Sequence, residues 1–98
     1  MVEYTWNPVK ARANLGKHQV GFTEAATVFE DPLGITVYDP DHSVDEERYL
    51  TVGASARGRL LIVAHAAEDD AIRIISARQL TRAERRDYED EVRERQGR

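Results

Sequence analysis

Arginines crowd the second half of the chain, where a segment of alternating aliphatic and polar residues leads into a helical pattern. Seven arginines lie between positions 57 and 86, against four acids in the same window. A guanidinium presents a rigid fork of hydrogen-bond donors that matches phosphate oxygens better than an ammonium does. Arg73 and Arg78 are therefore the first candidates to bind a phosphate, and a merely solubilising surface is the alternative.

A second candidate set lies on the first predicted helix. It consists of Lys10, Asn14, Lys17 and His18. Their i, i+4, i+7 and i+8 spacing aligns them on one helix face. Two lysines, an amide and an imidazole suit contact with phosphate, whereas a solvated helix face is the alternative.

One histidine, His65, ends the most apolar predicted strand and shares a strand face with Arg59 by two-residue alternation. If the last two strands are neighbours, His65 can converge with Arg73 and Arg78 on one sheet face. His65 is then a catalytic candidate. The alternative is a packed, hydrogen-bonded histidine without a chemical role.

Metal and covalent chemistries lack their usual sequence patterns. The three histidines, at 18, 42 and 65, are too scattered for a helical zinc motif. The acids between 39 and 47 lack the glycine and the final glutamate of a calcium loop, and the chain has no cysteine. RNA cleavage without metal or cofactor remains compatible, because it needs only a base for the ribose 2′-hydroxyl, cations for the phosphate and an acid.

Composition indicates a single small domain over residues 1–98. No apolar run approaches the roughly 20 residues of a membrane span, and the first residues do not resemble a signal peptide, so we expect a cytoplasmic protein without membrane contact. The net charge of −4 argues against a general nucleic-acid coat. Residues 1–50 carry four Lys/Arg and nine Asp/Glu, whereas residues 51–98 carry ten Lys/Arg and nine Asp/Glu. An acidic half and a mildly basic half suit a protein with one local anion site.

Hydrophobic periodicity, caps and turns predict the order β-α-α-β-β-β-β-α. The strands are predicted at 2–6, 33–38, 48–53, 59–66 and 71–77, and the helices at about 8–18, 23–31 and 81–95. Short loops between successive strands indicate an antiparallel meander. The sequence thus predicts an α+β domain with helices packed on an antiparallel sheet.

The last predicted helix begins with a capping box, Thr81-x-x-Glu84. Its apolar content is thin, with Ala83, Tyr88 and Val92 the main candidates for packing. A helix this polar is held weakly by its own core, so we expect it to be mobile or completed by a partner.

Several segments form a distinctive combination along the chain. They are Trp6 with Lys10 and Asn14, Lys17-His18, residues 22–26 and 28–32, Glu47-Arg48, Gly53, Gly58-Arg59, residues 73–78, and residues 82–85 with Tyr88. Together these segments resemble the BrnT toxins. The resemblance covers nearly the whole chain in order. Asn7-Pro8 and Gln19 depart from the family pattern, at a cap and a turn.

The resemblance implies a ribonuclease toxin of RelE-like fold in a type II toxin–antitoxin system, which cleaves RNA and arrests translation. It also implies a BrnA-like ribbon-helix-helix antitoxin and a heterotetramer that binds operator DNA. The catalytic candidates are Arg73, Arg78, His65, Lys17, His18 and Glu47, and the RNA-binding candidates are Lys10, Asn14, Arg48, Arg59 and Tyr88. The general base stays open, and a catalytically silent binding module within a repressor complex is the competing hypothesis.

Overall fold

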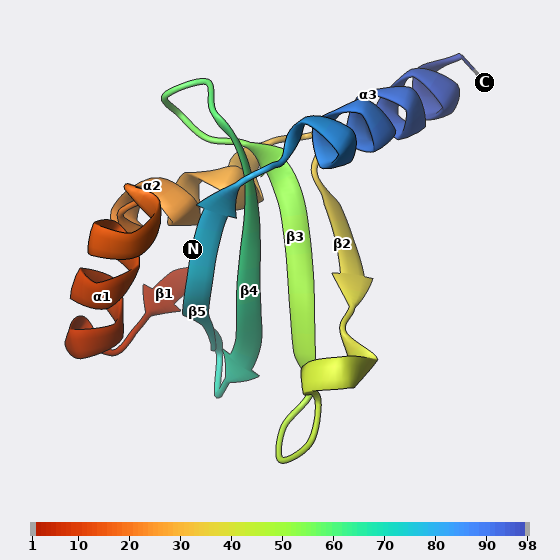
Figure 1. Ribbon diagram of the computed structural model, residues 1–98. Helices are drawn as coiled ribbons and strands as arrows, with labels where there is room; N and C mark the ends of the chain where they lie inside the picture. The colour runs from red at the N-terminus through yellow and green to blue at the C-terminus, as the bar shows by residue number, and fades with distance from the viewer. Residues whose placement is uncertain (1, 98) are drawn as a thin grey trace.

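The computed structural model describes residues 2–97, which fold around one five-stranded sheet (Figure 1). The strands are β1 (Glu3–Thr5), β2 (Ile35–Tyr38), β3 (Arg48–Ala54), β4 (Leu60–Glu68) and β5 (Ala71–Gln79). The helices are α1 (Pro8–His18), α2 (Phe22–Ala26) and α3 (Arg82–Gln96), and two short 3-10 helices are η1 (Thr27–Glu30) and η2 (Pro40–His42). The predicted α+β class is confirmed.

The sheet is mixed, with strand order β1-β5-β4-β3-β2. Strands β2 to β5 form the predicted antiparallel meander, but β1 pairs parallel to β5, with Glu3 opposite Ala71 and Thr5 opposite Arg73. The prediction of a wholly antiparallel sheet was therefore wrong at this edge. After β1 the chain crosses through the helices and enters the sheet at its far edge, so β1 meets the last strand rather than the next one.

The hydrophobic core lies between the sheet and the α1–α2–η1 segment. Its helical side is formed by Val20, Phe22, Ala25 and Val28, and its sheet side by Leu61, Val63, Ile74 and Ala77. Leu61 and Val63 point to one face of the sheet by period-two alternation, and an irregularity in β5 between Ile74 and Ser76 brings Ile74 and Ala77 to the same face. On the opposite face of β3, β4 and β5, the described residues place no buried helix, although Asp87 and Tyr88 of α3 approach Ile62 at one end. We call it the open face.

Local chemistry explains the helix boundaries. The Asn7 side chain accepts hydrogen bonds from the backbone N–H groups of Val9 (2.8 Å) and Lys10 (3.2 Å), and Gln19 ends α1 in the left-handed conformation with φ 56°. The second predicted helix divides into α2 and η1. At this division the Thr27 hydroxyl donates to the carbonyl of Glu24 at 2.6 Å.

Helix α3 has the predicted capping box: the Thr81 hydroxyl accepts from Glu84 N–H at 3.2 Å, and Glu84 Oε1 accepts from Thr81 N–H at 2.9 Å. The helix points away from the sheet (Figure 1), and none of its described residues is buried. Tyr88 fastens it by donating to the carbonyl of Leu33 at 3.1 Å. Within residues 2–97, no helix combines the length and apolar character needed to cross a membrane.

Candidate functional site

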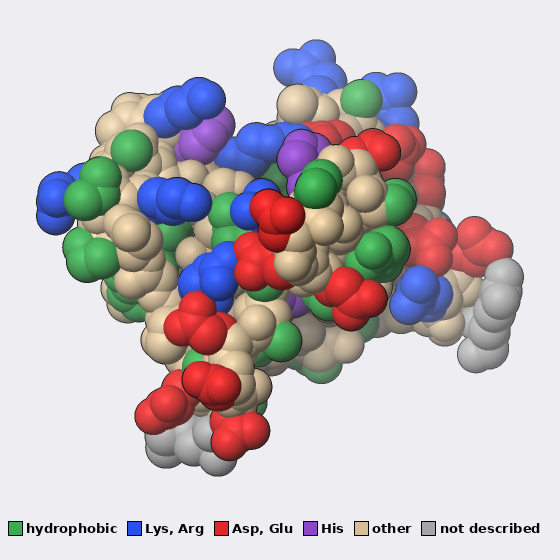
Figure 2. Space-filling view, turned by 90° about the horizontal axis from the view of Figure 1, so that it is seen from below, with side chains coloured by type: hydrophobic (Ala, Val, Ile, Leu, Met, Phe, Trp, Pro, Cys, Tyr) green, Lys and Arg blue, Asp and Glu red, His purple; other side chains and the backbone are tan. Residues whose placement is uncertain are grey.

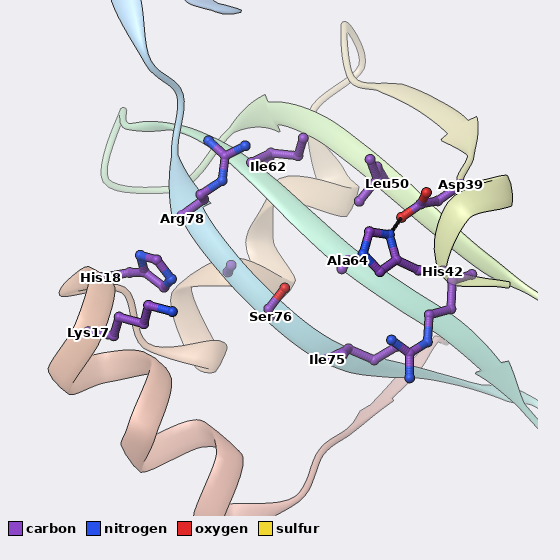
Figure 3. A pocket seen from close by; sticks show the side chains of 12 residues that line it. Lys17, His18, Asp39, His42, Leu50, Ile62, Ala64, Ile75, Ser76 and Arg78 are labelled. Atoms are coloured by element: carbon purple, nitrogen blue, oxygen red, sulfur yellow. Dashed lines mark hydrogen bonds and ion pairs between the residues drawn. The ribbon is translucent and has the colours of Figure 1, made fainter. Parts of the chain in front are cut away.

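A pocket of about 440 Å³ lies on the open face, between the end of α1 and the η2 turn (Figure 3). Its floor is made mostly of aliphatic residues of the sheet: Leu50, Ile62, Ala64 and Ile75. One wall carries Lys17 and His18 of α1, and the other carries Asp39 and His42. Arg48 and Arg78 complete the lining, together with Ser76 and Ala77. In Figure 2, basic side chains gather around a hollow flanked by histidines.

A β-bulge in β5 aims the two predicted arginines to the same side. In a regular strand, positions five residues apart point to opposite faces. Here Ala64 pairs with Ser76 while His65 pairs with Ile74, so Ile75 is an extra residue on β5. The bulge reverses the alternation. Arg73, opposite Ala66, and Arg78, opposite Ile62, consequently share the open face.

Arg78 lines the pocket and also grips the start of α3. Its two terminal nitrogens donate to the two carboxylate oxygens of Glu84, at 2.7 and 2.9 Å. The hydrogen bonds from Arg78 and from the Thr81 backbone lower the pKa of Glu84 to about 2. The same carboxylate therefore caps α3 and holds one of the site's arginines.

Arg73 lies on the open face outside the pocket lining, in the same cross-strand row as Arg48. It pairs with Glu46 and, at 3.1 Å, with Glu68. Hydrogen bonding to Glu46 and Glu68 raises the pKa of Arg73, and its ion pair lowers the pKa of Glu46. Glu46 also lies 3.5 Å from Arg48, so it links the two cations.

Asn14 fixes the α1 wall of the pocket. Its amide nitrogen donates to the carbonyls of Val20 (2.9 Å) and Ala77 (2.8 Å), and its oxygen accepts from Ala77 N–H (3.1 Å). The side chain is only 7% exposed. The prediction that Asn14 contacts RNA is therefore corrected, because a buried amide bonded at both ends serves to hold α1 against β5. This places Lys17 and His18 at the pocket.

His42 is a site residue that sequence reasoning missed. Its Nδ1 lies 2.8 Å from Asp39 Oδ2, and both side chains line the wall opposite Lys17 and His18 (Figure 3). In the sequence the pair appears only as Asp39-x-x-His42 within an acidic loop. The i, i+3 spacing brings the two side chains together because η2 is a 3-10 turn, in which such positions align.

His65 does not join the arginines. It points to the helix-covered face, is 8% exposed, and its Nε2 lies 2.8 Å from the Thr51 hydroxyl. Its ring and that of Phe29 meet edge to face, with centroids 4.8 Å apart, and burial lowers the pKa of His65. The predicted convergence of His65 with Arg73 and Arg78 was wrong. The extra residue in β5 puts both arginines on the open face, whereas His65 in β4 points to the other face.

Arg59 has a structural position. Its Nε donates to Glu24 at 2.9 Å and its Nη2 donates to the carbonyl of Gln19 at 3.0 Å, which ties the β3–β4 turn to α1 and α2. The ion pair with Arg59 lowers the pKa of Glu24, whose side chain is 9% exposed. Arg59 thus lies outside the pocket lining, and its role in RNA contact stays a prediction.

The remaining candidates lie outside the pocket. Glu47 accepts from the Tyr49 hydroxyl at 3.4 Å, and Tyr49 stacks on His65 on the helix-covered side, whereas the preceding Glu46 reaches the open face. Tyr88 secures α3 through Leu33, as described above. Lys10 is exposed on α1, two turns before Lys17, and its role in RNA contact stays a prediction.

Comparison with known proteins agrees with this architecture. Residues 6–84 match the family model of the ribonuclease toxin BrnT of type II toxin–antitoxin systems. The crystal structure of the Brucella abortus ribonuclease toxin BrnT, at 1.1 Å resolution, superposes with a TM-score of 0.62 and 16% sequence identity, covering 84% of this chain and 100% of that chain. At this identity the likeness shows the fold alone. Among curated proteins, none matches significantly. Because the family model spans most of the sequence, the chain belongs to the BrnT family of ribonuclease toxins of type II toxin–antitoxin systems.

Proposed function

We propose that the chain is an endoribonuclease toxin that cleaves RNA at the open-face pocket, without a metal ion, through attack of the ribose 2′-hydroxyl on the adjacent phosphate. The observation that carries this proposal is the convergence of Lys17, Arg48 and Arg78 around one pocket on an acidic molecule. Three cations from three separate elements form an anion site of the size of one phosphate group and its neighbours.

The chemistry follows from the lining. Lys17, Arg48 and Arg78 hold the phosphate and stabilise the charge that grows on its oxygens in the transition state. The imidazoles of His18 and His42 are available for proton transfer. Arg73 supports Arg48 through their shared partner Glu46, and Lys10 extends the basic edge of α1 along the bound strand.

In the cell this activity arrests translation in the cytoplasm, and a BrnA-like ribbon-helix-helix antitoxin neutralises it. The two proteins form a heterotetramer that represses its own operator DNA. Membership of a type II toxin–antitoxin family supports the partner. The exposed α3, which has no buried residue of its own, supports a partner-facing role for that helix. The mixed sheet with helices on one face supports the RelE-like assignment.

The proposal predicts that purified protein cleaves RNA in the presence of excess chelator. Cleavage should leave 2′,3′-cyclic phosphate ends, and an oligonucleotide with a 2′-deoxy sugar at the scissile position should resist. Arg48→Ala and Arg78→Ala should each lose about 100-fold in rate, because each removes a cation from the developing charge. Cleavage rates are measured by gel electrophoresis of end-labelled RNA.

Arg86→Ala is the matched control, since Arg86 is an exposed arginine of α3 outside the pocket lining, and it should cleave normally. Arg78→Lys checks the fold, because it keeps the positive charge beside Glu84. Cleavage that chelator abolishes, or that proceeds at a 2′-deoxy site, would contradict the mechanism.

A catalytically silent binding module is the second candidate function. One observation favours it: the guanidinium groups of Arg73 and Arg78 already hold carboxylates of Glu46, Glu68 and Glu84. Under this function the wild-type protein leaves RNA intact, and Arg78→Ala weakens binding of the antitoxin instead. Titration calorimetry with the antitoxin, run beside the cleavage assay, separates the two functions.

A further inference from the structure

The Asp39–His42 pair is built into a short, well-fastened turn. The Ser43 hydroxyl donates to the carbonyl of Asp39 at 2.6 Å and accepts from Arg48 N–H at 2.9 Å. The Asp39 N–H donates in turn to the carbonyl of Arg48 at 2.9 Å. These bonds fix the η2 turn to the start of β3, which is the strand that brings Arg48 to the pocket.

The two side chains differ in exposure in the way a proton-transfer pair requires. The Asp39 side chain is 14% exposed, whereas the His42 side chain is 68% exposed. A carboxylate at 2.8 Å from Nδ1 selects the tautomer with the proton on Nδ1, so the Nε2 lone pair is free to accept a proton. The carboxylate also stabilises the imidazolium that forms when Nε2 takes the proton.

His18 faces this pair across the pocket floor (Figure 3). It is the last residue of α1, and the carbonyl end of a helix favours a cation. Displacement at phosphorus places the entering and leaving oxygens on opposite sides, so the base and the acid belong on opposite walls of the pocket.

We propose, on the basis of the ribonuclease function above, that His42 is the general base, that Asp39 orients it, and that His18 is the general acid. His42 Nε2 takes the proton of the ribose 2′-hydroxyl as O2′ bonds to phosphorus. The bond from phosphorus to O5′ breaks, and O5′ takes a proton from the imidazolium of His18. The products are a 2′,3′-cyclic phosphate and a free 5′-hydroxyl. No oxidant, reductant or further reactant is needed.

The experiment uses an end-labelled RNA that the parent protein cleaves at one site, and the same RNA with a bridging 5′-sulfur at that site. A thiolate leaves without protonation, so the sulfur substrate needs no general acid. His18→Gln should be slowed about 100-fold on normal RNA and restored to within about 10-fold of the parent on the sulfur substrate. His42→Gln should be slowed about 100-fold on both substrates.

Asp39→Asn tests the positioning role. An amide at this position can donate to Nδ1 and favour the wrong tautomer, so kcat should fall about 10-fold or more while KM stays unchanged. Combining it with His42→Gln should cost no more than His42→Gln alone, since both act through one group. Asp41→Asn is the matched control, because it makes the same change in the same turn outside this pocket, and should stay within about 3-fold of the parent.

A parent that cleaves RNA while His42→Gln retains its rate would overturn this assignment and leave the ribonuclease function standing. Rescue of His42→Gln by the sulfur substrate, with no rescue of His18→Gln, would overturn the direction of proton transfer. A parent that cleaves no RNA would overturn both the function and the assignment.

Discussion

At the scale of single residues, burial separates the polar side chains that bond within the protein from those that reach the open face. Asn14 and His65 are buried, with 7% and 8% exposure, and their side chains form hydrogen bonds within the protein. His42 and Glu46 come from a loop that looks merely solvated in the sequence, yet they reach the open face. Residue type alone could not separate these two groups, because burial depends on what packs against each position.

The buried His65 predicts a pH-dependent stability. Burial lowers its pKa below 6.5 in the folded protein, so the unfolded chain binds a proton more readily. The stability that the fold has with a neutral His65 is fully present above about pH 6.5. It is lost as the pH falls towards the folded-state pKa of His65. Between about pH 7.5 and about pH 5.5 the wild type should lose up to about 1.4 kcal/mol from this group.

His65→Gln should lack this component, and urea denaturation of both proteins at the two pH values measures the difference. The comparison isolates His65, because every other titratable group is present in both proteins. An equal loss of stability in both proteins would show that His65 titrates normally in the fold.

At the scale of elements, the bulge in β5 and the cap of α3 organise the site. The extra residue Ile75 brings Arg73 and Arg78 to one face. The capping residue Glu84 then ties Arg78 to the first turn of α3. A weakly packed helix is thus coupled to the pocket by one carboxylate.

Glu84→Ala should destabilise the first turn of α3 and release Arg78, because it removes the oxygen that accepts from Thr81 N–H. The lost capping interaction costs on the order of 1 kcal/mol, and the ion pair adds little because its side chains are more than a third exposed. Thermal denaturation and the helical circular dichroism signal measure this effect. Glu89→Ala is the matched control, since Glu89 makes an exposed 3.8 Å pair with Arg85 within α3 and should change stability by a few tenths of a kcal/mol or less. Equal behaviour of the two variants would contradict the capping role.

At the scale of the whole molecule, a net charge of −4 coexists with a cation-lined pocket. In Figure 2 acidic side chains lie below and to the right of the basic hollow. Under the proposed function, the acidic net charge disfavours extended contact with RNA, so binding should involve few phosphates. Screening limits exposed charges to about 8–10 Å at physiological salt, which lets one local site act against the total charge.

This arrangement predicts a shallow dependence of RNA affinity on salt. Neutralisation of about three phosphates of a single strand gives a slope of about −2 in log affinity against log salt concentration. Fluorescence anisotropy with a 2′-deoxy oligonucleotide, which binds without being cleaved, measures the slope. Lys17→Ala should reduce its magnitude by about 0.7. A slope steeper than about −5 would indicate a broad nucleic-acid coat instead.

The sequence by itself determined the features that depend on neighbouring residues. The α1 cap at Asn7, the α3 capping box at Thr81 and Glu84, the antiparallel meander and the family resemblance all arise from contiguous residues. Caps and hairpins form hydrogen bonds between backbone groups and residues a few positions away. They can therefore be predicted from short stretches of sequence.

Only the tertiary structure decided the parallel pairing of β1, the bulge at Ile75 and the composition of the pocket. The bulge is one unpaired residue, and it reverses the facing of every residue after it without leaving a sequence signal. The pocket joins the end of α1 to a turn more than twenty positions later and to strands further along. Those contacts depend on long-range packing. For this reason the sequence did not predict that His42 lines the pocket and that His65 does not.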